Sequence, residues 1–232
     1  MVADRDDSDP GFVGERLAQV GGELTFCLRE SFPADGSAPD LDPTDLVLLL
    51  GSHHGVADPG REGPVGAESQ LVLDCLARDV PVIAICYGAQ LVAHALGGLV
   101  TKQGGREIGW YYVDSHDPAL CPPGPWVQYH YDNFTVPAGA RLLGESAAGA
   151  QGFAIETEDG VLRLVAWQFH PEVSPEILQR WVSDGIDDLA GMGVDAAAFV
   201  AEAEQRAAYS RAGAHALIDV TLDAMSLLRA NA

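Results

Sequence analysis

Apolar and polar positions in the first half of the chain alternate between the spacing typical of strands and the spacing typical of helices. Residues 45–50 form an almost unbroken apolar run, which is typical of a strand covered on both faces. A helix that follows residue 86 is expected to end at Gly97-Gly98, a plausible C-cap. The other expected elements are strands at 2–3, 23–28, 45–50 and 81–86, helices at 11–20 and 65–79, and loops at 33–44 and 59–64.

The second half changes character, because short β-type runs are separated by glycine, proline and aspartate. Such runs predict antiparallel additions to a sheet. Ser174 followed by Pro175 predicts an N-cap and the start of a helix, and the chain is helical from there. The expected additional strands lie at 108–113, 126–129, 141–145, 153–156 and 162–167.

Alternating strands and helices predict an α/β fold with a doubly wound, mostly parallel sheet, helices on both faces, small antiparallel additions and C-terminal helices. We expect a catalytic domain over residues 1–185 and a C-terminal helical extension over 186–232 packed on the same domain. Leu217, Val220 and Leu227 recur there at helical spacing. That face is expected to pack on its own domain or on a homodimer partner rather than to hold a cofactor.

Cys86 stands at a sharp corner between the predicted strand 81–86 and the helix after it, with Gly88 two residues later. This arrangement is typical of a nucleophile elbow, which exposes a side chain above the sheet edge. The amides at a helix start favour thiolate over thiol and can stabilise an oxyanion. A buried structural cysteine is the alternative reading, and strand, corner and glycine together favour a nucleophile.

A second apolar strand ends in His170-Pro171-Glu172, which offers a base and an orienting carboxylate. Side chains two apart on an extended chain share a face, so Glu172 can accept from one imidazole nitrogen while the other faces the thiol. Nucleophile, base and orienting acid are the parts of a catalytic triad. His130 is the rival base, and Asp132 follows it at the same spacing, but Asp132 is better explained as a substrate contact.

The segments Cys86-Tyr-Gly-Ala-Gln90 and Gln168-Phe-His-Pro-Glu172 together resemble the class I (triad) glutamine amidotransferases. The resemblance covers residues 1–185 and is strongest to stand-alone domains similar to the glutaminase domain of guanosine monophosphate synthetase. It includes 107–110 and 128–134, the latter resembling the family's Trp-His-x-Asp-x-Phe segment. It implies a flavodoxin-like architecture.

The resemblance implies Cys86 as the nucleophile, His170 as the general acid/base and Glu172 as its orienting partner. The oxyanion hole is expected to use the backbone N–H groups of Tyr87 and, in the loop after strand 45–50, of Ser52. That loop reads Gly51-Ser-His-His-Gly, whereas the family's loop is richer in glycine.

Substrate contacts are expected from the same resemblance. Gly51 matches the family, and Gln90 lies one helical turn beyond Cys86 on the same face. Tyr129, Tyr131 and Asp132 lie in the segment whose backbone the family uses for substrate. The tyrosines could instead be strand residues packed beside the sheet. Tyr131 stands where the family commonly has a small residue.

The implied reaction is hydrolysis of the glutamine side-chain amide through a cysteinyl γ-glutamyl thioester, with no cofactor or metal. The chain lacks a phosphate-binding loop for using the ammonia, so a separate synthetase subunit is implied. Two alternatives stay open. One is a γ-glutamyl amide hydrolase acting alone, and the other is a non-catalytic relative that binds glutamine.

The composition of the chain narrows the classes of molecule that it is expected to bind. The 232 residues carry a formal net charge of −21, which disfavours nucleic acid and anionic membranes. Four widely spaced cysteines predict neither a disulfide framework nor a zinc site. The adjacent His53 and His54 are expected to shape the pocket rather than chelate a metal. No signal peptide or membrane span is expected, so the predicted compartment is the cytoplasm.

Overall fold

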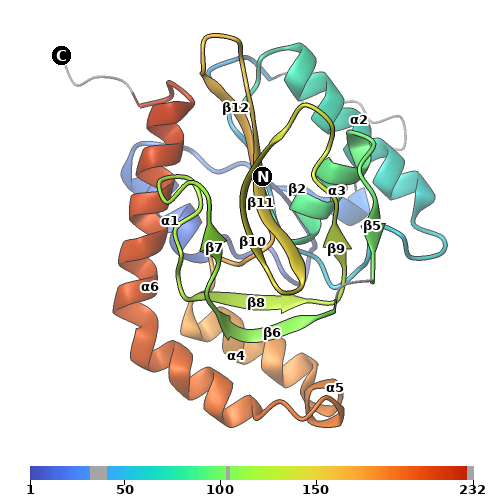
Figure 1. The fold of residues 1–232 in the computed structure, drawn as a ribbon, viewed down its shortest axis with the longest axis vertical. Coiled ribbons are helices and arrows are strands. Elements are labelled where there is room, and N and C mark those ends of the chain that lie inside the picture. The colour runs from blue at the N-terminus through green and yellow to red at the C-terminus, as the bar shows by residue number, and fades with distance from the viewer. Residues whose placement is uncertain (32–40, 103–104, 229–232) are drawn as a thin grey trace.

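The computed structural model describes residues 1–31, 41–102 and 105–228, and its centre is one eight-stranded sheet (Figure 1). The strand order is β2-β1-β3-β4-β12-β11-β10-β7, parallel from β2 to β12 and antiparallel from β12 to β7. The strands are β1 (Val2–Ala3), β2 (Cys27–Leu28), β3 (Val47–Leu49), β4 (Val82–Ile85), β7 (Asp114–Ser115), β10 (Arg141–Ser146), β11 (Gly149–Glu156) and β12 (Leu162–Trp167).

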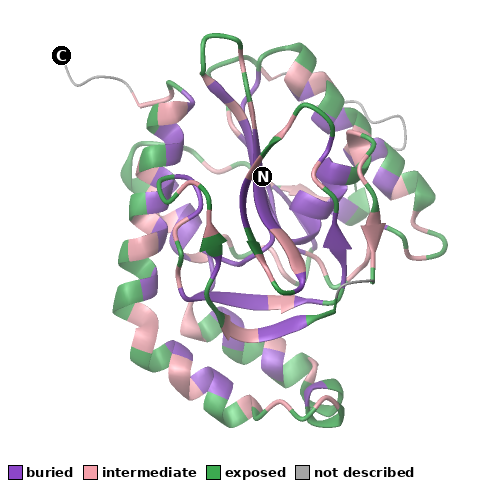
Figure 2. Cartoon of the chain, in the orientation of Figure 1, coloured by how far each residue is buried: buried purple, intermediate pink, exposed green. Residues whose placement is uncertain are grey.

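Helices cover both faces of this sheet, because the central strands are apolar on both sides. In β4, Ile83 and Ile85 belong to one core cluster, which contains residues of α1 (Gly11–Gln19) and α6 (Ala196–Ala224). Val82 and Ala84 belong to the opposite cluster, which contains residues of α2 (Glu62–Ala77) and α3 (Tyr87–Ala95). The buried segments lie between these layers (Figure 2). The doubly wound α/β prediction is confirmed.

Two antiparallel pairs and two further helices complete the described fold. The antiparallel pair of β6 (Glu107–Tyr111) and β8 (Trp126–His130) lies beside α4 (Pro175–Asp184) in Figure 1. The pair β5 (Val100–Thr101) and β9 (Asn133–Phe134) lies apart from it, and α5 (Ile186–Gly191) precedes α6. The domain boundary at residue 185 stays a prediction, although α6 buries Leu217, Ile218 and Leu222 in the core beside α1.

Two local capping signals placed helix ends correctly. The Ser174 hydroxyl accepts a hydrogen bond from the backbone N–H of Ile177 at 3.3 Å, so the predicted N-cap is confirmed. Gly97 has φ +83°, and Gly98 N–H donates to the Ala93 carbonyl at 2.7 Å, which closes the helix as predicted. Within the described residues, no helix combines the length and the apolar character needed to cross a bilayer.

Several element predictions were wrong in extent, among them the strand expected over 153–156, which is Gly149–Glu156. The strand expected over 23–28 forms only at Cys27–Leu28, on the outer edge of the sheet. The loop expected over 59–64 is too long, because α2 begins at Glu62 and includes Pro64 in its first turn. Proline is tolerated there, since the N–H groups of the first turn have no partner within the helix. The strand expected over 45–50 is Val47–Leu49. Of the loop expected over 33–44, residues 33–40 lie outside the described residues.

The register of β4 and β12 sets the place of the site. These strands are parallel neighbours, with Trp167 opposite Ile85. Their carboxyl ends therefore emerge side by side, and Cys86 follows one end while His170 follows the other. The backbone N–H of Cys86 donates to the Trp167 carbonyl at 2.7 Å. Ligands of doubly wound folds bind at such strand ends.

Candidate active site

Cys86 occupies the corner between β4 and α3 in a conformation that few non-glycine residues adopt. Its φ is +51° and its ψ is −107°, and its side chain is 5% exposed. Such a conformation costs of order 1–3 kcal/mol and persists only where the surroundings enforce it. A Cβ on Gly88 would lie 2.6 Å from the Leu49 carbonyl oxygen, so the close turn requires glycine there. This is the geometry of a nucleophile elbow.

The imidazole of His170 is held by a carboxylate and by the backbone. Its Nδ1 lies 2.7 Å from Oε1 of Glu172, and both side chains are buried. Because a carboxylate only accepts, Nδ1 donates. The His170 N–H donates to the Val127 carbonyl at 2.9 Å, which ties the residue to β8. The ring meets Trp181 edge-on with centroids 4.8 Å apart. Nε2 has no hydrogen-bond partner among the described residues.

Cys86 and His170 meet at Gly51, the first residue after β3 and Leu50. A Cβ on Gly51 would lie 3.3 Å from Cε1 of His170 and 3.8 Å from Cβ of Cys86. Both side chains line one cavity of about 760 Å³. The thiol and the imidazole, 84 positions apart in the sequence, therefore face the same space.

Electrostatics favour a charged imidazole in this setting. Burial opposes protonation, but Glu172 and Cys86 outweigh it and raise the pKa of His170 well above its ordinary value. The charged imidazolium is therefore favoured over the neutral ring. A cation beside the sulfur stabilises a thiolate, and its Nε2–H is a proton available for a leaving group.

The residues expected to supply the oxyanion hole flank this pair. Tyr87 is the first residue of α3, and the first N–H groups of a helix have no partner within the helix. Ser52 lines the cavity, and its hydroxyl accepts from the His54 N–H at 3.1 Å. The assignment of their two backbone N–H groups to the oxyanion stays a prediction, and it requires both to point at one position beside the sulfur.

The residues expected to contact substrate all line the cavity. The amide nitrogen of Gln90 donates to the Asp132 carbonyl at 3.1 Å and to Oε1 of Gln168 at 3.2 Å. Burial raises the pKa of Asp132, whose Oδ1 has no hydrogen-bond partner among the described residues. Tyr131 is 41% exposed, whereas Tyr129 is half-buried and packs edge-on against Trp181.

Sequence reasoning missed a role for Gln168. Its side chain is fully buried, and its Nε2 lies 3.6 Å from the Cys86 sulfur, within donor range of a thiolate. The same amide accepts from Gln90, so a chain of amides links the sulfur to the segment at Asp132. The available signal was its position two residues before His170, because side chains two apart on an extended chain share a face.

His130 does not compete for the thiol. Its Nδ1 lies 3.0 Å from the Asp132 carbonyl, and its Nε2 lies 3.3 Å from Glu107. Glu107 also accepts from the amide of Gln151 at 2.8 Å. His130 lines the cavity, but both of its ring nitrogens are engaged in a buried polar network with Asp132 and Glu107.

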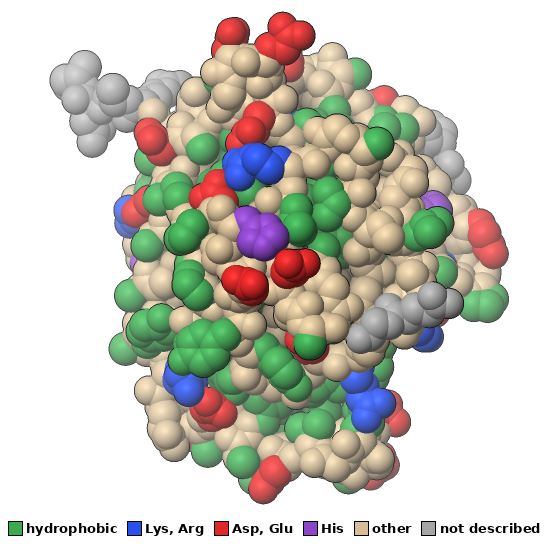
Figure 3. All heavy atoms as spheres, viewed as in Figure 1, with side chains coloured by type: hydrophobic (Ala, Val, Ile, Leu, Met, Phe, Trp, Pro, Cys, Tyr) green, Lys and Arg blue, Asp and Glu red, His purple; other side chains and the backbone are tan. Residues whose placement is uncertain are grey.

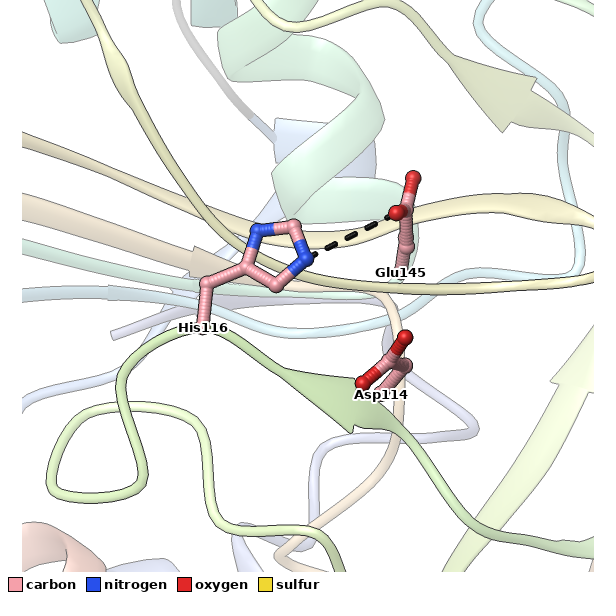
Figure 4. A group of neighbouring side chains, drawn as sticks. All are labelled: Asp114, His116 and Glu145. Atoms are coloured by element: carbon pink, nitrogen blue, oxygen red, sulfur yellow. Dashed lines mark ion pairs between the residues drawn. The ribbon is translucent and has the colours of Figure 1, made fainter.

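The remaining histidine clusters lie outside the Cys86–His170 contact. His53 and His54 line the cavity with ring centroids 3.9 Å apart, and His53 is exposed. At the edge of the large sheet, His116 lies 3.5 Å from Glu145 and close to Asp114 (Figure 4). These three side chains are exposed. On the face of the molecule in Figure 3, basic side chains lie singly among acidic ones.

Gly51→Ala is expected to lower the turnover number about ten- to a hundredfold with a small effect on stability. The added methyl group would lie 3.3 Å from Cε1 of His170 and press on that ring, and small misplacements at a reacting centre are costly. Gly63→Ala is the matched control, because a Cβ there meets open space in the first turn of α2. Equal turnover of the two variants under steady-state assay would contradict this role of Gly51.

Comparisons with known proteins agree with the geometry. The family model for glutamine amidotransferase class-I matches residues 15–187. A GMP synthase [glutamine-hydrolyzing] of Bartonella henselae is 33% identical over 150 residues, covering 59% of this chain and 27% of the relative. One of Mycobacterium bovis is 37% identical over 123 residues, covering 49% and 22%. The matched part thus spans about a quarter of these relatives.

Solved structures share the fold. A glutamine amidotransferase from Thermotoga maritima has a TM-score of 0.80 at 23% identity, with 96% of each chain covered. A glutamine amido transferase from Methylobacillus flagellatus also has a TM-score of 0.80 at 23% identity, covering 96% of this chain and 93% of that one. With the family model matching well over half its length, the chain belongs to the class-I glutamine amidotransferases.

Proposed function

We propose that this protein hydrolyses the side-chain amide of glutamine through a γ-glutamyl thioester on Cys86. The observation that carries the proposal is the meeting of Cys86 and His170 at Gly51, with Glu172 bound to the far nitrogen of the imidazole. Nucleophile, acid/base and orienting acid are then in the order that acyl transfer needs. Family membership supports the amide as substrate.

In the first half-reaction the Cys86 thiolate attacks the amide carbon, and the carbonyl electron pair moves onto oxygen. The N–H groups of Tyr87 and Ser52 stabilise this oxyanion. When it collapses, the C–N bond breaks and the leaving nitrogen takes the Nε2 proton of His170, so ammonia departs. The enzyme is left with a thioester and a neutral imidazole, which Glu172 holds by Nδ1–H.

In the second half-reaction water attacks the thioester carbon while Nε2 of His170 takes its proton. Collapse of the new tetrahedral species breaks the C–S bond and releases the γ-carboxylic acid, which loses its remaining proton to solvent and becomes glutamate. The sulfur leaves as thiolate and the imidazole is again protonated, which restores the starting ion pair. The cavity wall at Gln90, Tyr129, Tyr131 and Asp132 would hold the α-amino and α-carboxylate end of the substrate.

The names of the relatives support a proposal for the fate of the ammonia. Their names describe a glutamine-hydrolysing GMP synthase, and this chain matches about a quarter of them. We propose that a separate synthetase subunit takes up the ammonia. The other candidate partner is a second copy of this chain, with which it would form a homodimer. Glutamate release from glutamine, measured with and without candidate synthetase subunits, tests this coupling. A rate unaffected by every such subunit would favour a hydrolase acting alone.

The cavity itself favours a second candidate, a γ-glutamyl amide with a larger amine. Cavities of some hundreds of cubic ångströms hold drug-sized ligands, and this one measures about 760 Å³. Glutamine would fill only part of it. A screen of glutamine against γ-glutamyl alkylamides, scored by glutamate release, separates the two. Higher kcat/KM for a bulky amide would favour this candidate, while an unreactive Cys86 thiol would favour a glutamine-binding relative without activity.

Glu172→Gln is expected to move the alkaline limb of the kcat/KM pH profile to lower pH. Glu172 contributes to the raised pKa of His170, so the imidazolium of the parent protein persists to higher pH. Without that negative charge the imidazolium deprotonates earlier as the pH rises, and the acid that protonates the leaving nitrogen is lost earlier. Profiles that coincide above neutrality would contradict the coupling between the two side chains.

A further inference from the structure

A buried cation contacts the peptide unit of one predicted oxyanion donor and the side chain of the other residue. Arg29, at the start of the short 3-10 turn Arg29–Ser31 after β2, is 3% exposed. Its guanidinium lies 2.8 Å from a carboxylate oxygen of Asp4 and 3.0 Å from one of Glu68, which are also buried. A charge is buried at this depth only where its partners outweigh the cost of removing it from water.

The remaining donors of Arg29 go to the backbone that leads into the cavity loop. Nη2 donates to the Leu50 carbonyl at 3.2 Å, and Nη1 donates to the Gly51 carbonyl at 3.3 Å. A guanidinium offers five N–H donors in a rigid fork, and here they join two carboxylates to two consecutive carbonyls. The start of the loop is therefore fastened to a fixed, charged anchor.

Fixing the Gly51 carbonyl also fixes the next N–H. A trans peptide unit is planar, and its C=O and N–H point in opposite directions. Since the Gly51 oxygen is turned towards Arg29, the Ser52 N–H of the same unit is turned away from it. We expect this N–H to face the cavity, because Gly51 and Ser52 line it and Arg29 is not among its described lining residues. Arg29 thus determines the direction in which the proposed donor points.

The same guanidinium also contacts the other proposed donor residue. It lies over the Tyr87 ring, 4.6 Å from the ring centroid, at the first position of α3. Asp4 extends the anchor towards the loop. Burial favours its neutral form, but Arg29 and the Ser52 hydroxyl outweigh burial and lower the pKa of Asp4 below its ordinary value. Both halves of the proposed oxyanion hole therefore rest on one buried ion network.

We propose that Arg29, held by Asp4 and Glu68, is a positioning residue that aligns the Ser52 and Tyr87 N–H groups for the oxyanion. This inference rests on the proposed function. Arg29 is not among the described residues that line the cavity, so we expect it to make no contact with substrate. It acts on the transition state through the Gly51–Ser52 peptide and through Tyr87, so its loss should appear in turnover rather than in substrate affinity.

The test compares Arg29→Met with the parent in two reactions at Cys86. Hydrolysis of glutamine develops an oxyanion, whereas alkylation of the thiol by iodoacetamide is a displacement at a CH₂ group and develops none. We expect the turnover number to fall about ten- to a thousandfold, with KM changed less than threefold. We expect the alkylation rate to stay within about threefold of the parent.

Arg16→Met is the matched control, because Arg16 forms a bidentate pair with Asp219 remote from the cavity, at 2.8 and 2.9 Å. Should Arg29→Met fail to fold, Arg29→Lys supplies the same test. Lysine keeps the positive charge between the carboxylates but not the fork that reaches both carbonyls. We expect Arg29→Lys to retain more thermal stability than Arg29→Met. Like Arg29→Met, it should lower the turnover number while leaving KM and the alkylation rate nearly unchanged.

Two results would overturn the inference, and they are distinguishable from each other. If the parent hydrolyses glutamine or another γ-glutamyl amide and the Arg29 variants keep its turnover number, or lose hydrolysis and alkylation in equal proportion, the positioning role alone is wrong. If the parent hydrolyses no γ-glutamyl amide, the proposed function fails, and the oxyanion role of Arg29 fails with it.

Discussion

Replacing Cys86 with alanine is expected to abolish glutamate release from glutamine, by at least about ten-thousandfold in the turnover number. The sulfur forms the covalent bond that divides the hydrolysis into two steps, and alanine offers no nucleophile. The fold should survive, because the new side chain is smaller and Cys86 lies at the cavity wall. The measurement is steady-state glutamate release alongside thermal unfolding.

Cys75→Ala is the matched control for that experiment. Cys75 is also buried, but it lies in α2 within the core cluster on the other face of the sheet. It should keep parental turnover. If Cys86→Ala retained activity, or if the two variants lost it equally, the thiol would not be the nucleophile and the proposed mechanism would fall.

His170→Ala is expected to lower turnover by about a thousandfold or more, and Glu172→Ala by a smaller factor of about ten to a hundred. His170 moves the proton in both half-reactions, whereas Glu172 orients the ring through its 2.7 Å hydrogen bond and raises the pKa of the imidazole. Orientation can be recovered in part by packing, since Trp181 and the Val127 carbonyl also hold His170.

The order of these two losses is the informative result. Both variants should be measured at the pH optimum of each, because loss of Glu172 changes the protonation of the imidazole. A larger loss for Glu172→Ala than for His170→Ala would contradict the roles assigned to them. It would point to Glu172 as the proton carrier and leave His170 as a buried structural residue.

Local patterns predicted the parts of the fold that short stretches of chain determine. The Cys86 corner follows from a β-branched run, a glycine two residues on and an Ala/Leu-rich run, and all of these lie within 81–98. The Ser174 cap is equally local. The edge strand β2 was overestimated, because propensity over 23–28 does not say how much of the segment finds a partner strand.

Long-range polar contacts escaped sequence reasoning for a physical reason. Arg29 and Glu68 are 39 positions apart, and Gln168 and Cys86 are 82 apart. Nothing in the spacing of such residues reports that they meet, and a single arginine or glutamine is ordinarily a surface residue. Only the structure shows that these side chains are buried and hydrogen-bonded to one another. The resemblance pointed to the triad, but not to the ion network beneath it.

The most direct test of the proposed mechanism is to trap the covalent intermediate. The protein is mixed with glutamine, quenched in acid during turnover, digested, and analysed by mass spectrometry. We predict one γ-glutamyl group on the peptide that carries Cys86, absent from Cys86→Ala and accumulating when deacylation is slowed. Steady glutamate release with no adduct on Cys86, or with an adduct on another residue, would contradict the mechanism.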